Sequence, residues 1–250
     1  IDGELQRFAQ DRLSQETSAS AVIMDAHSGA IYALASYPSF DPNVFSGGIP
    51  TSLWKELNAN IAKPLTNKAV SGEYPPASTF KMVTLLAALQ AGATNPKKRV
   101  HCSGVYRFGN TKFHSGKKGG HGSVDAKKAL QVSCDTYFYE VCQATGIDNI
   151  AKAARSLGLG SQLDLEISAE RSGLIPDKDW KRANRDEYWY PGETIVASIG
   201  QGYVQTTPLQ LATMTARLVN GGYAVKPWVT ADGLANNIMP PGGWPKMVLD

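Results

Sequence analysis

Three groups of residues in this 250-residue chain could do chemistry, and the first is Ser78-Thr79-Phe80-Lys81. It follows a Pro-Pro-Ala loop and opens an apolar run, which predicts a helix start. Residues three apart at a helix start share a face, so the Ser78 hydroxyl and the Lys81 amine would be neighbours. Serine is a weak nucleophile until a base accepts its proton, and burial can lower the pKa of a lysine enough to make it that base. The alternative is an N-cap serine beside a solvated lysine.

The second group is Ser133-Cys134-Asp135, which falls between two predicted helices. A hydroxyl and a carboxylate two residues apart in a turn can point the same way. They could then join a proton relay with the first group. The pattern is too short to indicate this alone, and it gains meaning only beside the first group.

The third group combines thiols and imidazoles within 33 residues. Two thiolates and two imidazoles suit tetrahedral zinc, although the spacing is not that of a zinc finger. Residues 101–124 have little hydrophobic content, so a loop of that length needs another restraint. The alternative is a buried free cysteine with solvated histidines. The candidate zinc ligands are Cys102, His114, His121 and Cys134.

A third cysteine, Cys142, is not expected to join them. Eight residues along a helix separate it from Cys134, a distance of about 12 Å at 1.5 Å per residue. We therefore predict that Cys142 belongs to the core.

The elements that must position these groups are mostly helices. A β-hairpin is predicted over 18–36 from two apolar runs joined by a His-Ser-Gly turn, and a strand over 223–230. Residues 93–124 are expected to be irregular and 158–190 a long polar connection. Strands from the two ends of the chain would form a sheet packed on a helical cluster, an α+β fold. Helices are predicted over 3–16, 51–60, 79–91, 125–132, 135–145, 148–157 and 207–220.

The amino-acid composition excludes several classes of protein. Hydrophobic residues make up 42% and charged residues 19%, which excludes a disordered or fibrous chain. A net charge of +3 is too small for a nucleic-acid binder. No apolar run approaches the roughly 18 residues of a membrane span, so the chain is expected to be soluble. Because it begins at Ile1, we expect it to be a piece of a longer protein whose membrane anchor is absent.

Taken together, the motifs resemble those of class B penicillin-binding proteins, and most of all the elongation-specific penicillin-binding protein 2 group. The resemblance runs from residue 1 to about 228, and it implies the penicillin-binding and serine β-lactamase-like transpeptidase fold, an antiparallel sheet with a helical subdomain. The whole of 1–250 would be one transpeptidase domain. The segments that carry the resemblance are IDGELQRFAQ, the hairpin, NKAVSGEYPPASTFK, SCDTYFYEV and ASIGQGYVQTTPLQLA.

The resemblance implies a peptidoglycan D,D-transpeptidase that needs no cofactor for catalysis. Ser78 would attack the D-Ala-D-Ala carbonyl of a stem peptide, D-Ala would leave, and a neighbouring stem-peptide amine would take the acyl group. β-Lactams would acylate the same serine. Lys81 would be the base and Ser133 a proton shuttle. Asp135, where most members have asparagine, would hold Lys81 and the substrate.

The zinc hypothesis also gains from the resemblance. Gly120-His121-Gly122 is similar to a metal-binding loop of the penicillin-binding protein 2 group, whose ligands include the cysteine of the S-x-D motif. The resemblance implies a structural zinc that pins this loop to the turn carrying Ser133 and Asp135.

Family members also carry a Lys-Thr-Gly strand, and no Lys-Thr-Gly occurs here. We expect the chain to stop before that strand, with the C-terminal strands, the N-terminal anchor and the pedestal all missing. That strand supplies an oxyanion-hole donor, and losing one such donor costs about a hundred- to thousandfold in rate. The chain alone is therefore expected to be nearly inactive.

The implied partners are stem peptides, β-lactams, a membrane glycosyltransferase and elongation-complex proteins, with no nucleic acid. The implied location is the periplasmic face of the bacterial inner membrane. Two alternatives stay open: a β-lactam-hydrolysing or β-lactam-sensing relative, and a non-catalytic cell-wall scaffold. The connection over 158–190 also carries four aromatic residues, which are expected to pack within an ordinary loop. The alternative is that they form a partner or substrate surface; they are Trp180, Tyr188, Trp189 and Tyr190.

Overall fold

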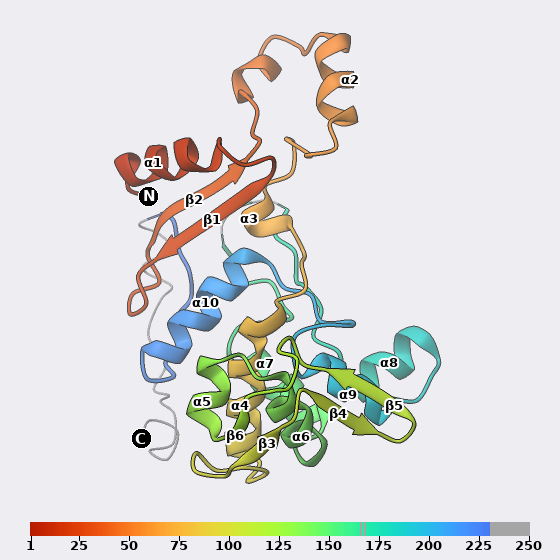
Figure 1. Ribbon diagram of the computed structural model, residues 1–250. Helices are drawn as coiled ribbons and strands as arrows, with labels where there is room; N and C mark the ends of the chain where they lie inside the picture. Colours follow the sequence, from red (N-terminus) through yellow and green to blue (C-terminus); the bar gives the residue numbers. More distant parts are fainter. Residues whose placement is uncertain (166, 168, 231–250) are drawn as a thin grey trace. The chain divides into compact units, whose positions relative to one another are not determined.

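The computed structural model describes residues 1–165, 167 and 169–230 (Figure 1). They form two compact units. Unit 1 comprises Ile1–Tyr74, Ser161–Ser172 and the described residues from Thr206 onward. Unit 2 comprises Pro75–Gly160 and Gly173–Gln205. No helix in the described residues is both long and apolar enough to cross a bilayer.

Unit 1 is built on the predicted hairpin. Strands β1 (Ala19–Met24) and β2 (Ile31–Tyr37) pair antiparallel, from Ala19 opposite Tyr37 to Met24 opposite Ile31. Because side chains alternate across a strand, the hairpin presents two faces. The face bearing Ala33 and Ala35 is covered by helix α1 (Gly3–Leu13), which lies within the helix predicted over 3–16.

The other face of the hairpin is covered by two helices. Helix α3 (Lys68–Ser71) and helix α10 (Pro208–Val219) both pack on β1. Their residues Val70 and Leu209 are fully buried and meet the apolar side chains of Val22, Met24 and Leu34. Thr207 caps α10 in a capping box with Gln210, so the predicted start of this helix is confirmed.

The predicted strand over 223–230 is wrong. In the described residues this segment contributes one isolated bridge, from Trp228 to Ala30. Two carbonyls that a strand would offer to a neighbour are occupied by side chains of the preceding helix region. Arg217 donates to the carbonyl of Val225 at 3.1 Å, and Asn220 donates to that of Tyr223 at 3.1 Å.

Unit 1 also carries a 3-10 turn, Pro42–Phe45, and helix α2 (Thr51–Ala59), as predicted for 51–60. Neither contains a buried residue. In Figure 1 these elements stand at the end of the unit away from α10.

Unit 2 is a helical cluster around α4 (Lys81–Gln90), which packs against α6 (Asp135–Thr145) and α7 (Ile147–Ser156). Helix α4 is buried on nearly every side, as expected from its apolar sequence. Its start differs from the prediction, because residues Ala77–Phe80 form a separate 3-10 turn that leads into it. The predicted helix over 125–132 is present as α5 (Ala126–Gln131).

Residues 93–124 are not irregular as predicted, because they contain two short antiparallel pairs. Strand β3 (Val100–Cys102) pairs with β6 (Gly122–Val124), and β4 (Val105–Phe108) pairs with β5 (Thr111–His114). Each strand has three or four residues, too few for an alternating pattern to be recognised in the sequence.

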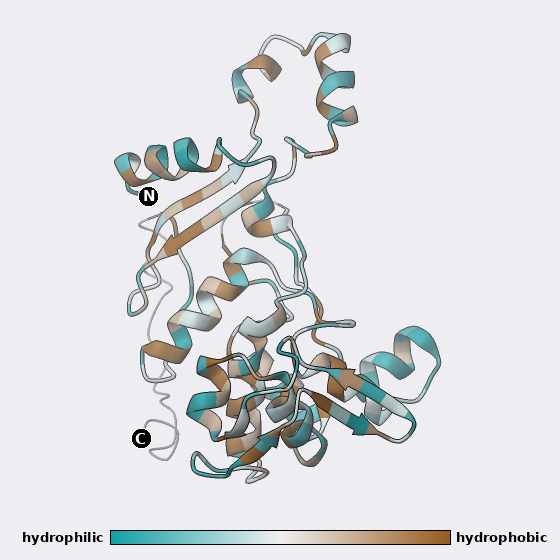
Figure 2. Ribbon diagram, in the orientation of Figure 1, coloured by the Kyte–Doolittle hydropathy of each residue, from teal (hydrophilic) through white to brown (hydrophobic). Residues whose placement is uncertain are grey.

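The predicted connection over 158–190 contains a helix, α8 (Lys178–Arg185), and α9 (Pro191–Ala197) follows it and packs on α6. The Asp177 carboxylate caps α8 by accepting from the Trp180 N–H at 2.7 Å. Helix α8 is hydrophilic over most of its surface (Figure 2), so it lacks the apolar stripe by which a helix is usually recognised.

The turn after α9 fits against the turn that carries Ser78. The Ala77 N–H donates to the Gly200 carbonyl at 3.0 Å. A Cβ atom on Gly200 would lie 2.4 Å from the Ala77 oxygen and 2.7 Å from the Phe80 Cβ, and the φ of Gly200 is +70°. Only glycine combines this backbone conformation with so close an approach.

We therefore expect Gly200→Ala to lower the free energy of unfolding by about 2 kcal/mol, because it adds backbone strain to a steric clash. Urea denaturation measures the change. Gly192→Ala is the matched control, since no atom lies within 4 Å of its Cβ position and its φ is not positive. Equal stability of the two variants would contradict the prediction.

Candidate active site

Ser78 and Lys81 are adjacent, as their spacing predicts. The Lys81 amine donates to the Ser78 hydroxyl at 3.1 Å. Ser78 lies in an exposed turn, whereas Lys81 is 1% exposed. The hydroxyl can therefore be reached from solvent while its amine neighbour is shielded from water.

Ser133 and Asp135 meet the same amine from the opposite side. Lys81 Nζ donates to Ser133 Oγ at 2.9 Å and to the Ser133 carbonyl at 3.0 Å, and it forms an ion pair with Asp135 Oδ1 at 2.5 Å. The Ser133 hydroxyl in turn donates to Ser78 Oγ at 2.8 Å. The four predicted residues thus form one connected network in unit 2.

The backbone is strained at two points in this network. Ala77, directly before Ser78, has a φ of 49°, and Ser133 has a φ of 51°. Residues with a Cβ rarely occupy this left-handed region, and each instance costs about 1–3 kcal/mol. Such strain is concentrated at functional sites, where the surrounding packing holds it in place.

The buried amine has its charge balanced locally. Burying an unpaired ammonium group costs several kcal/mol, and here the Asp135 carboxylate compensates the charge. Phe138 adds a ring whose centroid lies 5.7 Å from Lys81 Nζ. The second carboxylate oxygen of Asp135 accepts the N–H of Gly116 at 3.2 Å. Asp135 is therefore held from two sides.

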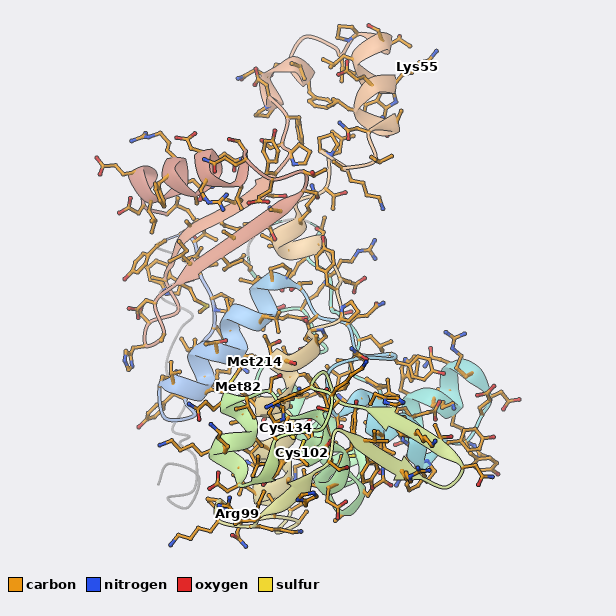
Figure 3. All side chains as sticks on the ribbon, viewed as in Figure 1. Lys55, Met82, Arg99, Cys102, Cys134 and Met214 are labelled. Carbon is orange, nitrogen blue, oxygen red and sulfur yellow. The ribbon has the colours of Figure 1, made fainter. Side chains whose placement is uncertain are left out.

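Beside this network, the structure gathers Cys102, His121 and Cys134 so that their ligand atoms lie within 4.8 Å of one another. The two cysteines are free, fully buried and adjacent (Figure 3). Their sulfurs are 2.7 Å apart, and His121 Nδ1 lies 3.5 Å from Cys102 Sγ. Two thiols and an imidazole converging in a buried place fit the donor preference of zinc, so this group could bind a metal.

The two thiols differ in acidity. Burial acts to raise the pKa of Cys102, but hydrogen bonds, led by that from Cys134, lower it to about 7. Burial and the bond to Cys102 raise the pKa of Cys134. One thiolate is therefore available near neutral pH, and a cation would stabilise a second one.

The predicted ligand His114 does not belong to this group. It lies in β5 opposite Val105, next in sequence to Phe113. Phe113 packs on Tyr139 of α6, so the alternation of the strand directs the His114 ring to the other, exposed side. Of the four predicted zinc ligands, the structure therefore brings three together and leaves His114 outside.

Two further contributors were missed by sequence reasoning. Gly116 acts through its backbone N–H, which no residue-type pattern can reveal. Gly200 acts through its shape, although a glycine after a helix does signal an unusual turn. The prediction for Cys142 is confirmed, because this residue is fully buried and does not belong to the metal group.

The chain was compared with known proteins. The family described as "Penicillin binding protein transpeptidase domain" matches residues 19–241. The peptidoglycan D,D-transpeptidase MrdA of Acinetobacter baumannii is 40% identical over 231 residues, which cover 92% of this chain and 34% of that protein. The chain thus spans about a third of the length of this relative.

Two solved structures are also similar. Pseudomonas aeruginosa PBP2 in complex with WCK 5153 superposes with a TM-score of 0.88 at 38% identity, covering 98% of this chain and 54% of that one. Helicobacter pylori PBP2 in its complex with MreC gives 0.87 at 30% identity, covering 92% and 42%. The predicted fold is confirmed, and the chain belongs to the penicillin-binding protein transpeptidase family, with the PBP2 and MrdA proteins as its relatives.

Proposed function

We propose that this chain carries the serine site of a peptidoglycan D,D-transpeptidase. Ser78 Oγ attacks the carbonyl carbon of a D-Ala-D-Ala peptide bond, an O–C bond forms, and the C–N bond to the terminal D-Ala breaks. A stem-peptide amine then takes the acyl group and frees Ser78. The observation that carries the proposal is that the exposed Ser78 hydroxyl accepts hydrogen bonds from both the Lys81 amine and the Ser133 hydroxyl.

Proton transfer follows from these contacts. A serine hydroxyl must lose its proton as it attacks, and the base must be within hydrogen-bond reach. An unprotonated Lys81 amine is within reach to accept this proton directly, and Ser133 offers a second route because it touches both Ser78 and Lys81. The same groups can return a proton to the departing D-Ala amine. Asp135 holds Lys81 in position in each step.

β-Lactams would react at the same hydroxyl. A strained cyclic amide presents its carbonyl as a D-Ala-D-Ala bond does, but its leaving group stays attached after ring opening. The acyl-enzyme therefore persists unless a water is activated. The family's name, which records penicillin binding, supports this part of the proposal.

We also propose that Cys102, His121 and Cys134 hold a structural zinc ion. Zinc would hold the loop before His121 against the turn 133–135. That turn places Cys134 between Ser133 and Asp135, and Gly116 of the same loop donates to Asp135. The ion would take no part in acyl transfer, and its chemistry here is the cross-linking of chain segments.

The setting of the whole protein is likewise a proposal. The Helicobacter pylori relative was solved with MreC, which supports an elongation-complex protein of that kind as a partner. Another relative was solved in a peptidoglycan synthase complex that coordinates polymerization and crosslinking, which supports a glycosyltransferase as a second partner. Acting on peptidoglycan would place the site on the periplasmic face of the inner membrane.

We expect a fluorescent penicillin to label Ser78 covalently, slowly but selectively. Because no Lys-Thr-Gly is present to supply an oxyanion donor, the rate should be about 10²–10³ below that of Acinetobacter baumannii MrdA. Lys81→Ala should reduce labelling by a further 10²–10⁴, the usual contribution of a general base. Labelling rates by gel fluorescence and the labelled peptide by mass spectrometry test both expectations.

Lys152→Ala is the matched control, because Lys152 is exposed on α7 and distant in sequence from the network. Ser78→Ala must carry no label. Labelling of Lys81→Ala at the wild-type rate would sink the proposal, as would a wild-type chain that never labels, which is the behaviour of a non-catalytic scaffold. Rapid release of the label would instead indicate a hydrolase.

We expect one zinc ion per chain when the protein is prepared in zinc-containing medium, measured by atomic emission. Cys102→Ser and His121→Ala should each abolish zinc binding. When the free zinc concentration is a hundred to a thousand times the Kd of the unaltered site, each variant should also have a free energy of unfolding about 3–4 kcal/mol lower than the unaltered chain. His114→Ala should keep both. Loss of zinc in His114→Ala alone, or a metal-free wild type, would contradict the three-ligand site.

A further inference from the structure

Charge is distributed very unevenly along this chain. Residues 97–128 hold nine of its 25 lysines and arginines and one of its 22 acidic residues, Asp125. The formal charge of this segment is therefore +8, although that of the whole chain is +3. A concentration of one sign draws oppositely charged ligands to that surface. The nine residues are Lys97, Lys98, Arg99, Arg107, Lys112, Lys117, Lys118, Lys127 and Lys128.

The hairpin β4–β5 places part of this charge on one face. Arg107 lies directly opposite Lys112 across the two strands, and His114 opposite Val105 is the next pair on that face. All three of these basic side chains are exposed. Hydrophilic and hydrophobic residues alternate along the hairpin (Figure 2).

The other face of the hairpin anchors it to unit 2. The rings of Tyr106 and Phe113 lie 5.9 Å and 5.7 Å, between centroids, from the ring of Tyr139 in α6. These contacts hold the hairpin against α6, so the backbone positions that carry the cations on the opposite face are fixed.

Arg107 and Lys112 have no ion-pair partner among the residues that the structure describes. Arg99 in the same segment, by contrast, bonds to Ser123 and pairs with Asp125 at 3.7 Å. Like charges directly opposite in a β-ladder destabilise it. An anion held between Arg107 and Lys112 would remove this repulsion.

Next to these residues lies a pocket of about 470 Å³. Its lining includes Arg107, Lys112, two histidines (His101 and His114) and one acidic residue, Glu140, so its cations outnumber its anions. Thr136 also lines it. This side chain is 4% exposed, it lies near the Cys102 sulfur, and within the described residues its hydroxyl makes no hydrogen bond of normal geometry. A buried hydroxyl beside guanidinium and ammonium groups suits a carboxylate.

The position of the pocket in the fold indicates which kind of molecule would supply this carboxylate. Thr136 directly follows Asp135 of the serine network, and Gly116 in the cationic segment donates to Asp135. A ligand in the pocket would therefore lie behind the turn that carries Ser133. No large hydrophobic residue of 97–128 is among the exposed ones, whereas binding in a membrane interface relies on apolar side chains that insert.

We propose that this cationic pocket binds carboxylate groups of an un-cross-linked peptidoglycan strand beside the serine site. The proposal rests on the transpeptidase function proposed above. The strand brings many peptides, each with a free C-terminal carboxylate, so the pocket can hold one peptide while another of the same strand reaches Ser78. Repeated weak contacts along a strand raise its effective concentration at the site.

The test measures binding of un-cross-linked peptidoglycan strands to the 250-residue chain. The charge-reversal variant Arg107→Glu/Lys112→Glu should bind these strands about tenfold more weakly at low salt, with the difference shrinking at high salt. Lys55→Glu/Lys152→Glu makes the same charge change at two exposed lysines outside the segment, and Lys55 is seen on α2 in Figure 3. This control should lose less than twofold. Strands whose carboxylates have been converted to amides should also bind weakly to the unaltered chain. Their affinity should equal that of unmodified strands for the Arg107→Glu/Lys112→Glu variant.

Three results would overturn the proposal: equal losses in both double variants, unchanged binding of the amidated strands, or charge-dependent binding to phosphatidylglycerol vesicles in place of the strands. Penicillin labelling of Ser78 is measured in parallel and should be the same in the charge-reversal variant and the unaltered chain. Absence of labelling in the unaltered chain would defeat the transpeptidase proposal, whereas normal labelling without a loss of strand binding would defeat only this inference.

Discussion

In unit 2 a buried amine joins the turn that carries Ser78 to the turn 133–135. Lys81 is 1% exposed, and its ammonium group would destabilise the fold by several kcal/mol without partners. It finds them in Asp135, in both oxygens of Ser133 and in Ser78. Since Ser133 and Asp135 are more than fifty residues from Lys81 in sequence, the network exists only when these segments of the helical cluster are packed together.

The S-x-D turn serves two clusters at once. Ser133 and Asp135 face Lys81, whereas Cys134 between them points to Cys102 and His121. The left-handed backbone at Ser133 is part of this arrangement, because it lets neighbouring side chains diverge within a tight turn. A metal on one side of the turn would thereby stabilise the strained geometry that the other side needs for proton transfer.

How much of the structure could be predicted from the sequence depended on how far apart the interacting residues lie along the chain. Ser78 and Lys81 are one turn apart, so local geometry alone brings them together. The helices α4 and α10 could be predicted because each has a long apolar run. The pairing with Ser133 and Asp135 spans more than fifty residues and required family resemblance. His114 was misassigned because its side depends on the register of a four-residue strand, and β3–β6 are too short to show alternation. The segment 223–230 forms no strand because side chains of the preceding helix region bond to two of its carbonyls, and no sequence pattern encodes these hydrogen bonds.

The hydroxyl that we propose as the nucleophile is positioned by groups that would take no part in the reaction. Ser78 sits in an exposed turn, where a hydroxyl would ordinarily sample several positions. Three contacts restrict the network around it: the Gly200 carbonyl holds Ala77, the Gly116 N–H holds Asp135, and the packing of Phe138 flanks Lys81. Displacement of a reacting group by about 1 Å can cost a hundredfold in rate, so in the proposed acyl transfer these supporting contacts would matter as much as the side chains that exchange protons.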